Sequence, residues 1–476
     1  MTKKLLQNTR FSAVLILLAP LLLFGCVSDI EENSNSRYST TAYQLEKKSK
    51  IRKKNVDGAP KNVIVFIGDG MGVTTLTAGR IFVGQEMGKF GEEHELSWDK
   101  FNHLALIKTY NTNAQVPDSA GTATAILSGY KTNIGAINVR PDKNLQKMFL
   151  EGCGGETLPT LTDKAKSQDK SVGIISTARL THATPAAMYS HSASRRIEAN
   201  KDLKAPFDYK GCKSISQQLV ESDVDLALGG GRKEFTQSQL GDWNGALVQT
   251  KAEMLTAPSN RRLLGLFTSS HMAFDADRDD TLEPSLAQMT NFAIDRLSSN
   301  AEGYVMMIEA GRIDHAHHGT NAYRALKDLQ ALDNAVSAAV ARAGDDTLIL
   351  VTADHSHAFT FSGYPVRGNP ILGLARSIDP ETGDAGEDYN LDENGKPYTT
   401  LGYQNGPNIR KRSSKTLTDD TVQSPDYKQQ TAVNLASETH GGDDVALFAY
   451  GPGADRFKGV MEQDEIGQIL GDLLGQ

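Results

Sequence analysis

Asn-Val-Ile-Val-Phe-Ile at residues 62–67 runs directly into Gly-Asp-Gly-Met-Gly at residues 68–72. An unbroken apolar run rich in β-branched side chains predicts a strand that is buried on both faces, and the glycines predict a tight turn into a helix. Strands of this kind lie in parallel sheets that helices cover on both sides. The stretch therefore predicts an α/β fold and puts Asp69 at the carboxyl end of a strand.

The same alternation continues along the chain. Further apolar runs are at residues 172–176, 224–228, 304–308, 347–352 and 445–450, and helical patterns are at 157–167, 286–298 and 322–342. We predict a large central, mostly parallel β-sheet flanked by helices on both faces. Two polar stretches, residues 243–262 and 363–430, are expected to elaborate this core, and the second should form a loop-rich insertion because it is dense in Gly, Pro, Asp and Asn.

Composition excludes several classes of protein. The chain has 476 residues, of which 39% are hydrophobic and 23% charged, and this mixture argues against a collagen-like fibre and a polytopic membrane protein. The net charge of −8 argues against nucleic-acid binding, which depends on a basic surface. Three cysteines are too few for a disulfide-dense scaffold.

Residues 1–26 resemble the signal of a bacterial lipoprotein. Basic residues precede an apolar run at 11–24, which is too short for a comfortable transmembrane helix and ends in Leu23-Phe24-Gly25-Cys26. The resemblance implies cleavage of a signal peptide, residues 1–25, and attachment of lipid to Cys26. Val27 then favours the outer membrane, at the periplasmic face of a bacterial cell envelope. Plain signal cleavage would instead give a secreted protein, and an uncleaved anchor is a further alternative.

Residues 26–60 are polar and charged and are expected to form a flexible tether between the lipid and a domain at residues 61–476. Basic side chains concentrate at residues 47–54, where they could contact anionic lipid or polysaccharide, or simply be solvated. Cys153 and Cys212 would then be the remaining thiols in an oxidising compartment, where two thiols most simply pair.

Acids and histidines gather where the predicted strands end. Asp69, Glu309, Asp354 and His355 each follow an apolar run immediately, and ligands of parallel sheets bind at the carboxyl ends of the strands. Asp314 and His318 stand four residues apart, so on a helix they share one face and could hold one metal ion. Other histidines lie in or near these segments, namely His182, His315, His317, His357 and His440. Mixed carboxylate and imidazole ligands suit zinc, whereas an all-oxygen pocket suits magnesium.

A candidate nucleophile lies in Pro-Asp-Ser-Ala-Gly-Thr-Ala-Thr-Ala at residues 117–125. Ser119 precedes small residues that can begin a helix, whose amino terminus favours an anion. The sequence has no Gly-x-Ser-x-Gly, no phosphate-binding P-loop and no His-Glu-x-x-His motif, so a serine esterase, a P-loop enzyme and a zincin are disfavoured. A serine without an obvious histidine base requires another activator, and a bound metal is one.

Six segments together resemble the alkaline phosphatase family, in that family's order. They are IGDGMG (67–72), PDSAGTATA (117–125), THATPAA (181–187), RIDHAHH (312–318), TADHSH (352–357) and ETHGGDD (438–444). The resemblance runs from about Lys61 to the carboxyl terminus. It implies hydrolysis of phosphate monoesters at alkaline pH, a phosphoserine intermediate, release of inorganic phosphate, two zinc ions, one magnesium ion and a homodimer.

The family's roles transfer position by position. One zinc ion would be held by Asp314, His318 and His440, the second by Asp69, Asp354 and His355 with Ser119, and magnesium by Asp69, Thr184 and Glu309. Arg195 would bind the phosphate and Asp118 would orient it, with Arg196 as the alternative alignment. His182 and His315 stand where the best-known enteric enzyme has Asp and Lys, as in animal enzymes, and an imidazole there could admit zinc as the third metal.

Two further features are similar to animal enzymes. Cys153 and Cys212 match an animal-type disulfide. An additional calcium site would lie within residues 266–284, where Phe267 and Glu283 fit but Thr268 stands where a glutamate ligand is expected. An acidic surface loop is the alternative for this segment.

Other reactions on the same scaffold are phosphodiester hydrolysis, sulfate ester hydrolysis and phosphoryl mutase activity. Sulfatases need a Cys/Ser-x-Pro-x-Arg context that the sequence lacks, and related diesterases commonly use threonine as the nucleophile and lack the arginine. A non-catalytic metal-binding or phosphate-binding lipoprotein would be expected to have lost a ligand or the serine, and none is missing. A phosphomonoesterase is therefore the favoured prediction.

Overall fold

The computed structural model describes residues 58–142, 155–203, 212–381, 383, 385–411 and 414–475. The predicted signal, Cys26, the tether up to residue 57 and Cys153 lie outside these residues, so lipidation and the disulfide of Cys153 with Cys212 stay predictions. Within the described part, no helix is both long and apolar enough to cross a membrane.

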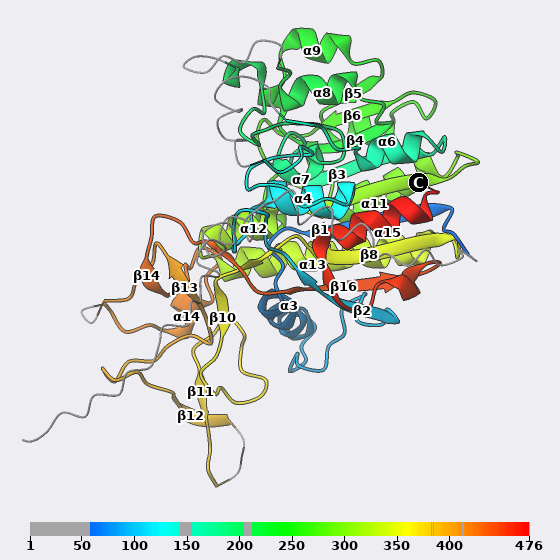
Figure 1. Ribbon diagram of the computed structural model, residues 1–476. Coiled ribbons are helices and arrows are strands. Elements are labelled where there is room, and N and C mark those ends of the chain that lie inside the picture. Colours follow the sequence, from blue (N-terminus) through cyan, green and yellow to red (C-terminus); the bar gives the residue numbers. More distant parts are fainter. Residues whose placement is uncertain are drawn as a thin grey trace, which may run out of the picture.

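A ten-stranded sheet organises the molecule (Figure 1). Its strands, in spatial order, are β17 (Gly459–Glu462), β2 (His103–Lys108), β16 (Val445–Tyr450), β8 (Thr347–Ala353), β1 (Asn62–Gly68), β7 (Tyr304–Ala310), β3 (Ser171–Arg179), β4 (Leu226–Gly230), β6 (Leu263–Leu266) and β5 (Ala246–Val248). Only β16 runs antiparallel to its neighbours. Every residue of β1, β7 and β8 is buried, which confirms the predicted mostly parallel sheet.

Helices cover the sheet in two packed groups. The first contains α3 (Val73–Glu86), α11 (Leu286–Leu297) and α13 (Ala322–Arg342), and the second contains α4 (Ser119–Ser128), α6 (Leu161–Lys166) and α15 (Gln463–Leu473). The predicted helix at 157–167 begins later, because Thr160 accepts a hydrogen bond from the Asp163 N–H and caps α6. Shorter helices are α7 (Ala183–Ala186), α8 (Ile215–Glu221), α9 (Gln237–Asp242), α10 (Lys251–Leu255), α12 (Arg312–His318) and α14 (Asp419–Val422).

Several strands are missing from the sequence-based prediction. The stretch 243–262 contains edge strand β5 and helix α10, and β2 alternates between buried and exposed residues, so neither strand forms a long apolar run. The stretch 363–430 contains β11 (Arg376–Ile378), β12 (Ala385–Tyr389), β13 (Leu401–Gly406) and α14, and it projects from the main sheet in Figure 1. It joins the body through β13, which pairs with β10 (Phe359–Phe361) and β14 (Thr431–Asn434).

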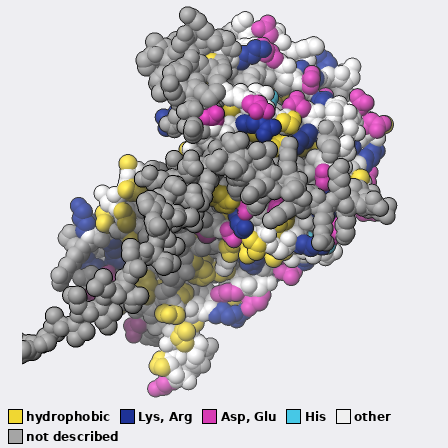
Figure 2. All heavy atoms as spheres, viewed as in Figure 1, with side chains coloured by type: hydrophobic (Ala, Val, Ile, Leu, Met, Phe, Trp, Pro, Cys, Tyr) yellow, Lys and Arg dark blue, Asp and Glu magenta, His cyan; other side chains and the backbone are white. Residues whose placement is uncertain are grey.

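Charged side chains of both signs are interspersed over the described part of the face seen in Figure 2. Such mixing differs from the single basic patch that nucleic-acid binding uses.

Candidate metal centre and nucleophile

Sheet register brings the predicted acidic residues to one edge. Ile67 of β1 lies opposite Glu309 of β7 on one side and Thr352 of β8 on the other. Asp69 directly follows β1 and Asp354 directly follows β8, at the carboxyl edge where α/β proteins bind ligands. Residues far apart in the chain thus meet because parallel neighbouring strands end together.

The first group of candidate ligands contains Asp69, Asp354 and His355, all fully buried. His355 Nε2 lies 3.3 Å from Asp69 Oδ1 and 3.4 Å from Asp354 Oδ2. The Gly70 N–H donates to Asp354 Oδ1 at 2.9 Å and fixes that carboxylate. Ser119 Oγ is 3.2 Å from His355 Nε2, so the candidate nucleophile borders this group as predicted.

The second group contains Asp314 and His318 of α12 together with His440 of β15 (His440–Gly441). His318 Nε2 and His440 Nε2 each lie 3.3 Å from Asp314 Oδ1. One turn of helix therefore presents Asp314 and His318 together, as their spacing predicts, and the final part of the chain adds His440.

Hydrogen bonds to backbone carbonyls fix which ring nitrogen is protonated in His318, His440 and His355. His318 Nδ1 lies 2.7 Å from the Glu438 carbonyl, and His440 Nδ1 lies 2.8 Å from the Pro117 carbonyl. His355 Nδ1 lies 3.1 Å from the Ser356 carbonyl. A carbonyl only accepts, so each Nδ1 carries the proton and each Nε2 is left with a lone pair. His318 Nε2 and His440 Nε2 face each other at 3.2 Å, an arrangement that a cation between them would stabilise.

Uncompensated carboxylates give a second test of whether metal ions fit. Among the residues that the structure describes, neither carboxylate oxygen of Asp69 has a hydrogen-bond donor as a partner. Burial, followed by the neighbouring charges of Asp354 and Asp314, raises the pKa of Asp69 well above its usual range. Burial likewise raises the pKa of Asp354. Cations would offset these like charges, so the donor set fits divalent metal ions.

A third group forms around Asp69, Glu309 and His182. Thr184 of α7 is fully buried, as is Glu309, which accepts a short hydrogen bond from the Ser176 hydroxyl. Burial raises the pKa of Glu309 to about 7 despite that hydrogen bond. The predicted magnesium ligands Asp69 and Glu309 thus come together, and His182 lies within reach of both.

Ser119 is the first residue of α4 and is 2% exposed. Asp118 caps this helix, since its side chain accepts from the Gly121 N–H at 3.2 Å. The amino end of the ten-residue helix therefore faces the nucleophile and favours an anion there.

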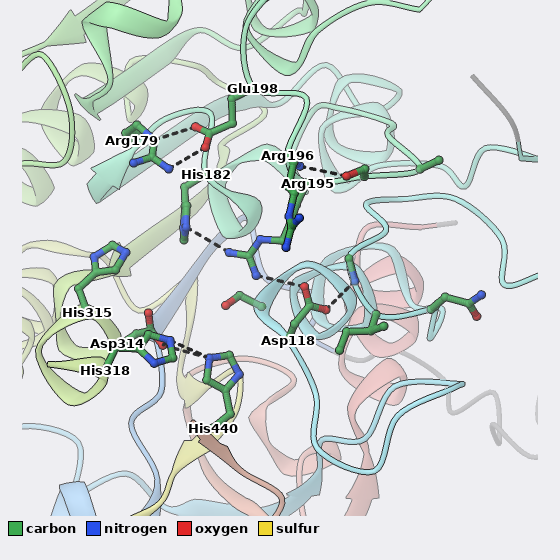
Figure 3. Close-up of a pocket in the computed structure, with 16 residues that line it drawn as sticks. Asp118, Arg179, His182, Arg195, Arg196, Glu198, Asp314, His315, His318 and His440 are labelled. Carbon is green, nitrogen blue, oxygen red and sulfur yellow. Dashed lines mark hydrogen bonds and ion pairs between the residues drawn. The ribbon is translucent and has the colours of Figure 1, made fainter. Parts of the chain in front are cut away.

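Arg195 lines the same cavity, next to Asp118 (Figure 3). Its Nη1 is 3.1 Å from Asp118 Oδ2, and its Nη2 is 3.1 Å from His182 Nε2. Burial, and next the charge of Arg195, lowers the pKa of His182 well below its usual range, so the imidazole is neutral and accepts from Arg195. The cavity has a volume of about 710 Å³ and is also lined by Ser119, His315, His318 and His440.

His357 and Glu438 belong to the site although no role was predicted for them. His357 Nε2 is 3.0 Å from Asp314 Oδ1, and its Nδ1 is 2.7 Å from Glu438 Oε2. Burial lowers the pKa of His357, but the hydrogen bonds to Asp314 and Glu438 outweigh it and raise that pKa to about 9. A charged His357 therefore holds Asp314 in place. The spacing His-x-His at 355–357, which in a strand puts both side chains on one face, was the available signal.

The predicted calcium segment uses its polar groups locally. Thr268 Oγ1 donates to the Ser270 carbonyl at 2.8 Å, and the Ala273 N–H donates to Glu283 Oε2 at 3.0 Å. Among the described residues, the side-chain groups close enough to share an ion do not include Glu283. Calcium binding at this loop therefore gains no support from its geometry.

Comparison with known proteins gives a consistent answer. A family model described as alkaline phosphatase matches residues 60–475. The tissue-nonspecific alkaline phosphatase of Felis catus is 38% identical over 92% of this chain and 88% of its own, and the alkaline phosphatase of Gadus morhua is 39% identical over 85% and 90%. A solved cold-active alkaline phosphatase from Shewanella sp. is similar in fold, with a TM-score of 0.64 and 24% identity over 87% of this chain and all of that one.

Proposed function

The chain belongs to the alkaline phosphatase family and hydrolyses phosphate monoesters with divalent metal ions, and we propose that two zinc ions, one magnesium ion and Ser119 form its reaction centre. The observation that carries this proposal is that Ser119, Arg195 and one ligand group, Asp314, His318 and His440, line one cavity. The other two groups border it through the contact of Ser119 with His355 and through His182.

The donor sets support the assignment of the metals. Asp314, His318 and His440 would hold one zinc ion, and Asp69, Asp354 and His355 the other, because each set mixes carboxylate and imidazole donors. Asp69, Thr184 and Glu309 would hold magnesium, which prefers oxygen. When bound, the zinc ions would lower the pKa of the Ser119 hydroxyl and offset negative charge on the entering and leaving oxygens.

The chain's own residues then carry out phosphoryl transfer. Ser119 Oγ loses its proton and forms a bond to phosphorus, while the bond from phosphorus to the leaving alcohol breaks on the opposite side. Arg195 binds two non-bridging oxygens with its planar fork, and Asp118 and His182 keep that fork in place. Water hydrolyses the phosphoserine in a second in-line step, which releases inorganic phosphate and restores Ser119.

Substitution of the nucleophile tests this mechanism. Ser119→Ala should lower the rate of p-nitrophenyl phosphate hydrolysis at alkaline pH by roughly a thousandfold or more. Ser128→Ala is a matched control, because Ser128 ends the same helix and its hydroxyl donates only to the Thr124 carbonyl at 2.7 Å. If Ser119→Ala hydrolysed the substrate at a near-normal rate, and no phosphoserine were detected in the protein, the assignment of Ser119 as the nucleophile would be refuted.

Metal analysis tests the cofactors separately. We expect about two zinc ions and one magnesium ion per chain, in line with the three ligand groups. Well under two zinc ions in active protein would contradict the zinc assignment, and zinc in place of magnesium would assign the third site to His182 and its neighbours. A higher rate on a phosphodiester than on the matched monoester would favour diesterase chemistry instead.

Cellular location and assembly form a further part of the proposal. We infer that lipid on Cys26 anchors the mature protein to the bacterial envelope, at the periplasmic face of the outer membrane, with residues 26–60 as the tether. We also propose a Cys153–Cys212 disulfide and a homodimer. Cys26→Ser should release the protein from membranes, and mass spectrometry of the mature protein should find a lipid on its first residue. A signal cleaved elsewhere would make the protein secreted.

A further inference from the structure

Three arginines line the cavity, and one of them differs from the other two. Arg195 is paired with Asp118 at 3.1 Å, and Arg179 donates to both oxygens of Glu198 at 2.8 and 2.6 Å. Arg196 is exposed, and within the described residues its guanidinium makes no hydrogen bond or ion pair. One positive charge on the cavity wall is therefore unpaired within the part of the chain that the structure describes.

The backbone that carries Arg196 is held firmly. The Arg195 N–H donates to the Gly135 carbonyl at 2.8 Å, and the Arg196 N–H donates to Ser194 Oγ at 3.2 Å. Ser192 exchanges backbone hydrogen bonds with Ile137 at 2.8 and 2.9 Å. The base of the Arg196 side chain is thus fixed next to that of Arg195, on the same wall of the cavity, while its guanidinium stays available (Figure 3).

We propose that Arg196 binds a second phosphate group of the substrate, so that the cavity favours substrates whose leaving group is itself a phosphate, such as nucleoside diphosphates and inorganic pyrophosphate. Arg195, together with the metal ions that the ligand groups would hold, binds the phosphoryl group that is transferred, and Arg196 binds the neighbouring one. A guanidinium suits this role because its planar fork binds two phosphate oxygens at once.

The reaction itself is unchanged by this second contact. Ser119 Oγ bonds to the terminal phosphorus, and the bond between that phosphorus and the bridging oxygen breaks. The leaving group is a nucleoside monophosphate or phosphate, and water then hydrolyses the phosphoserine. Arg196 touches only the leaving group, so it acts on specificity and not on the nucleophile.

Paired kinetics on adenosine diphosphate and adenosine monophosphate test the proposal, because the two share a nucleoside and differ in the leaving group. Arg196→Ala should lower kcat/KM about tenfold for the diphosphate and less than about twofold for the monophosphate. Arg196→Lys keeps the charge but loses the fork, and should fall between wild type and Arg196→Ala. Methylenediphosphonate should likewise inhibit Arg196→Ala more weakly than wild type, with little change for inorganic phosphate.

Lys458→Ala is the matched charge control. Lys458 is exposed and precedes β17, which runs parallel to β2, so it lies at the edge of the sheet opposite the cavity. Its removal should leave the diphosphate-to-monophosphate ratio unchanged. Equal losses on both substrates, or no loss on the diphosphate, would overturn the role of Arg196. A wild-type protein inactive on the monophosphate would instead overturn the proposed centre itself.

Discussion

The candidate site has two sides that balance charge differently. On the side that we call the metal wall, Asp69, Asp354 and Glu309 are fully buried next to the cavity; they make no ion pair with lysine or arginine among the described residues, and burial raises the pKa of each. On the arginine wall, Asp118 meets Arg195 and Glu198 meets Arg179. Among the described residues, the arginine wall pairs Arg195 and Arg179 with carboxylates and leaves only Arg196 without one, whereas the metal wall requires cations from outside.

Removal of the metal ions should have the largest effect on activity, because only the metal wall depends on cations from outside the protein. Chelation should lower the monoesterase activity to below about a hundredth of its original value. Ser119 then loses the metal ion that activates it, and Arg195 alone cannot offset the negative charge of the transferred phosphoryl group. The melting temperature should fall by several degrees, since ions bound only by the folded state stabilise it. Activity assays and calorimetry with and without added zinc and magnesium measure both. Full activity after verified metal loss would show that the metal wall does not drive the reaction.

The substitution Arg195→Lys should have the second-largest effect, on the binding of phosphate. Lysine keeps the charge but cannot bind two phosphate oxygens in one plane, so the inhibition constant of inorganic phosphate should rise about tenfold or more. Metal content should stay at the wild-type value, because Arg195 is not a ligand. Arg195→Ala is the companion variant, and a phosphate affinity equal to wild type in either protein would contradict phosphate binding by the arginine wall.

Asp118→Asn should have a smaller effect on the same measurement. Asparagine can still cap α4, but it removes the charge that holds Arg195, so phosphate should bind about threefold more weakly. Circular dichroism and metal content, both expected to match wild type, serve as controls. Tighter phosphate binding in the variant would mean that Asp118 does not orient Arg195.

The smallest expected effect is on how the free energy of unfolding of the metal-free protein changes with pH. Glu309 has a folded pKa of about 7 against 4.5 in an unfolded chain, so the folded state keeps a proton that the unfolded state loses. Stability due to this group is complete below pH 4.5 and is lost as pH rises to about 7. Glu309→Gln cannot ionise and still accepts from Ser176.

Melting curves of the chelated wild type and Glu309→Gln across this pH range test the expectation. The wild type should lose more stability than the variant as pH rises, and added metal should abolish the wild-type loss. If the melting temperatures of the two chelated proteins fell equally with rising pH, the pKa of Glu309 would not be raised in the folded state.

Much of the fold was predictable because its central strands are buried on both faces. Residues 62–67, 304–308 and 347–352 form continuous apolar runs, and they became β1, β7 and β8. Edge strands were not predicted, because β2 is half exposed and β5 spans only Ala246–Val248. Such strands exist through pairing with a neighbour, which the local sequence does not encode.

The site divides in the same way. Spacing alone put Asp314 and His318 on one helical face, and the apolar runs put Asp69 and Asp354 at strand ends. The roles of His357 and Glu438 depend on contacts between segments 81 residues apart in sequence. Nothing in the sequence indicated that Arg179 would be paired with Glu198 and Arg196 would not.

The sequence by itself determined the central buried strands, the family and the side chains available for metal and phosphate, because these follow from local periodicity and motifs. The tertiary structure decided which of those side chains meet and how each charge is balanced. Register between β1, β7 and β8 set the metal wall, and the anchoring of residues 192–196 on residues 135–137 set the arginine wall. Charge compensation is a property of distance, and only the folded chain fixes those distances.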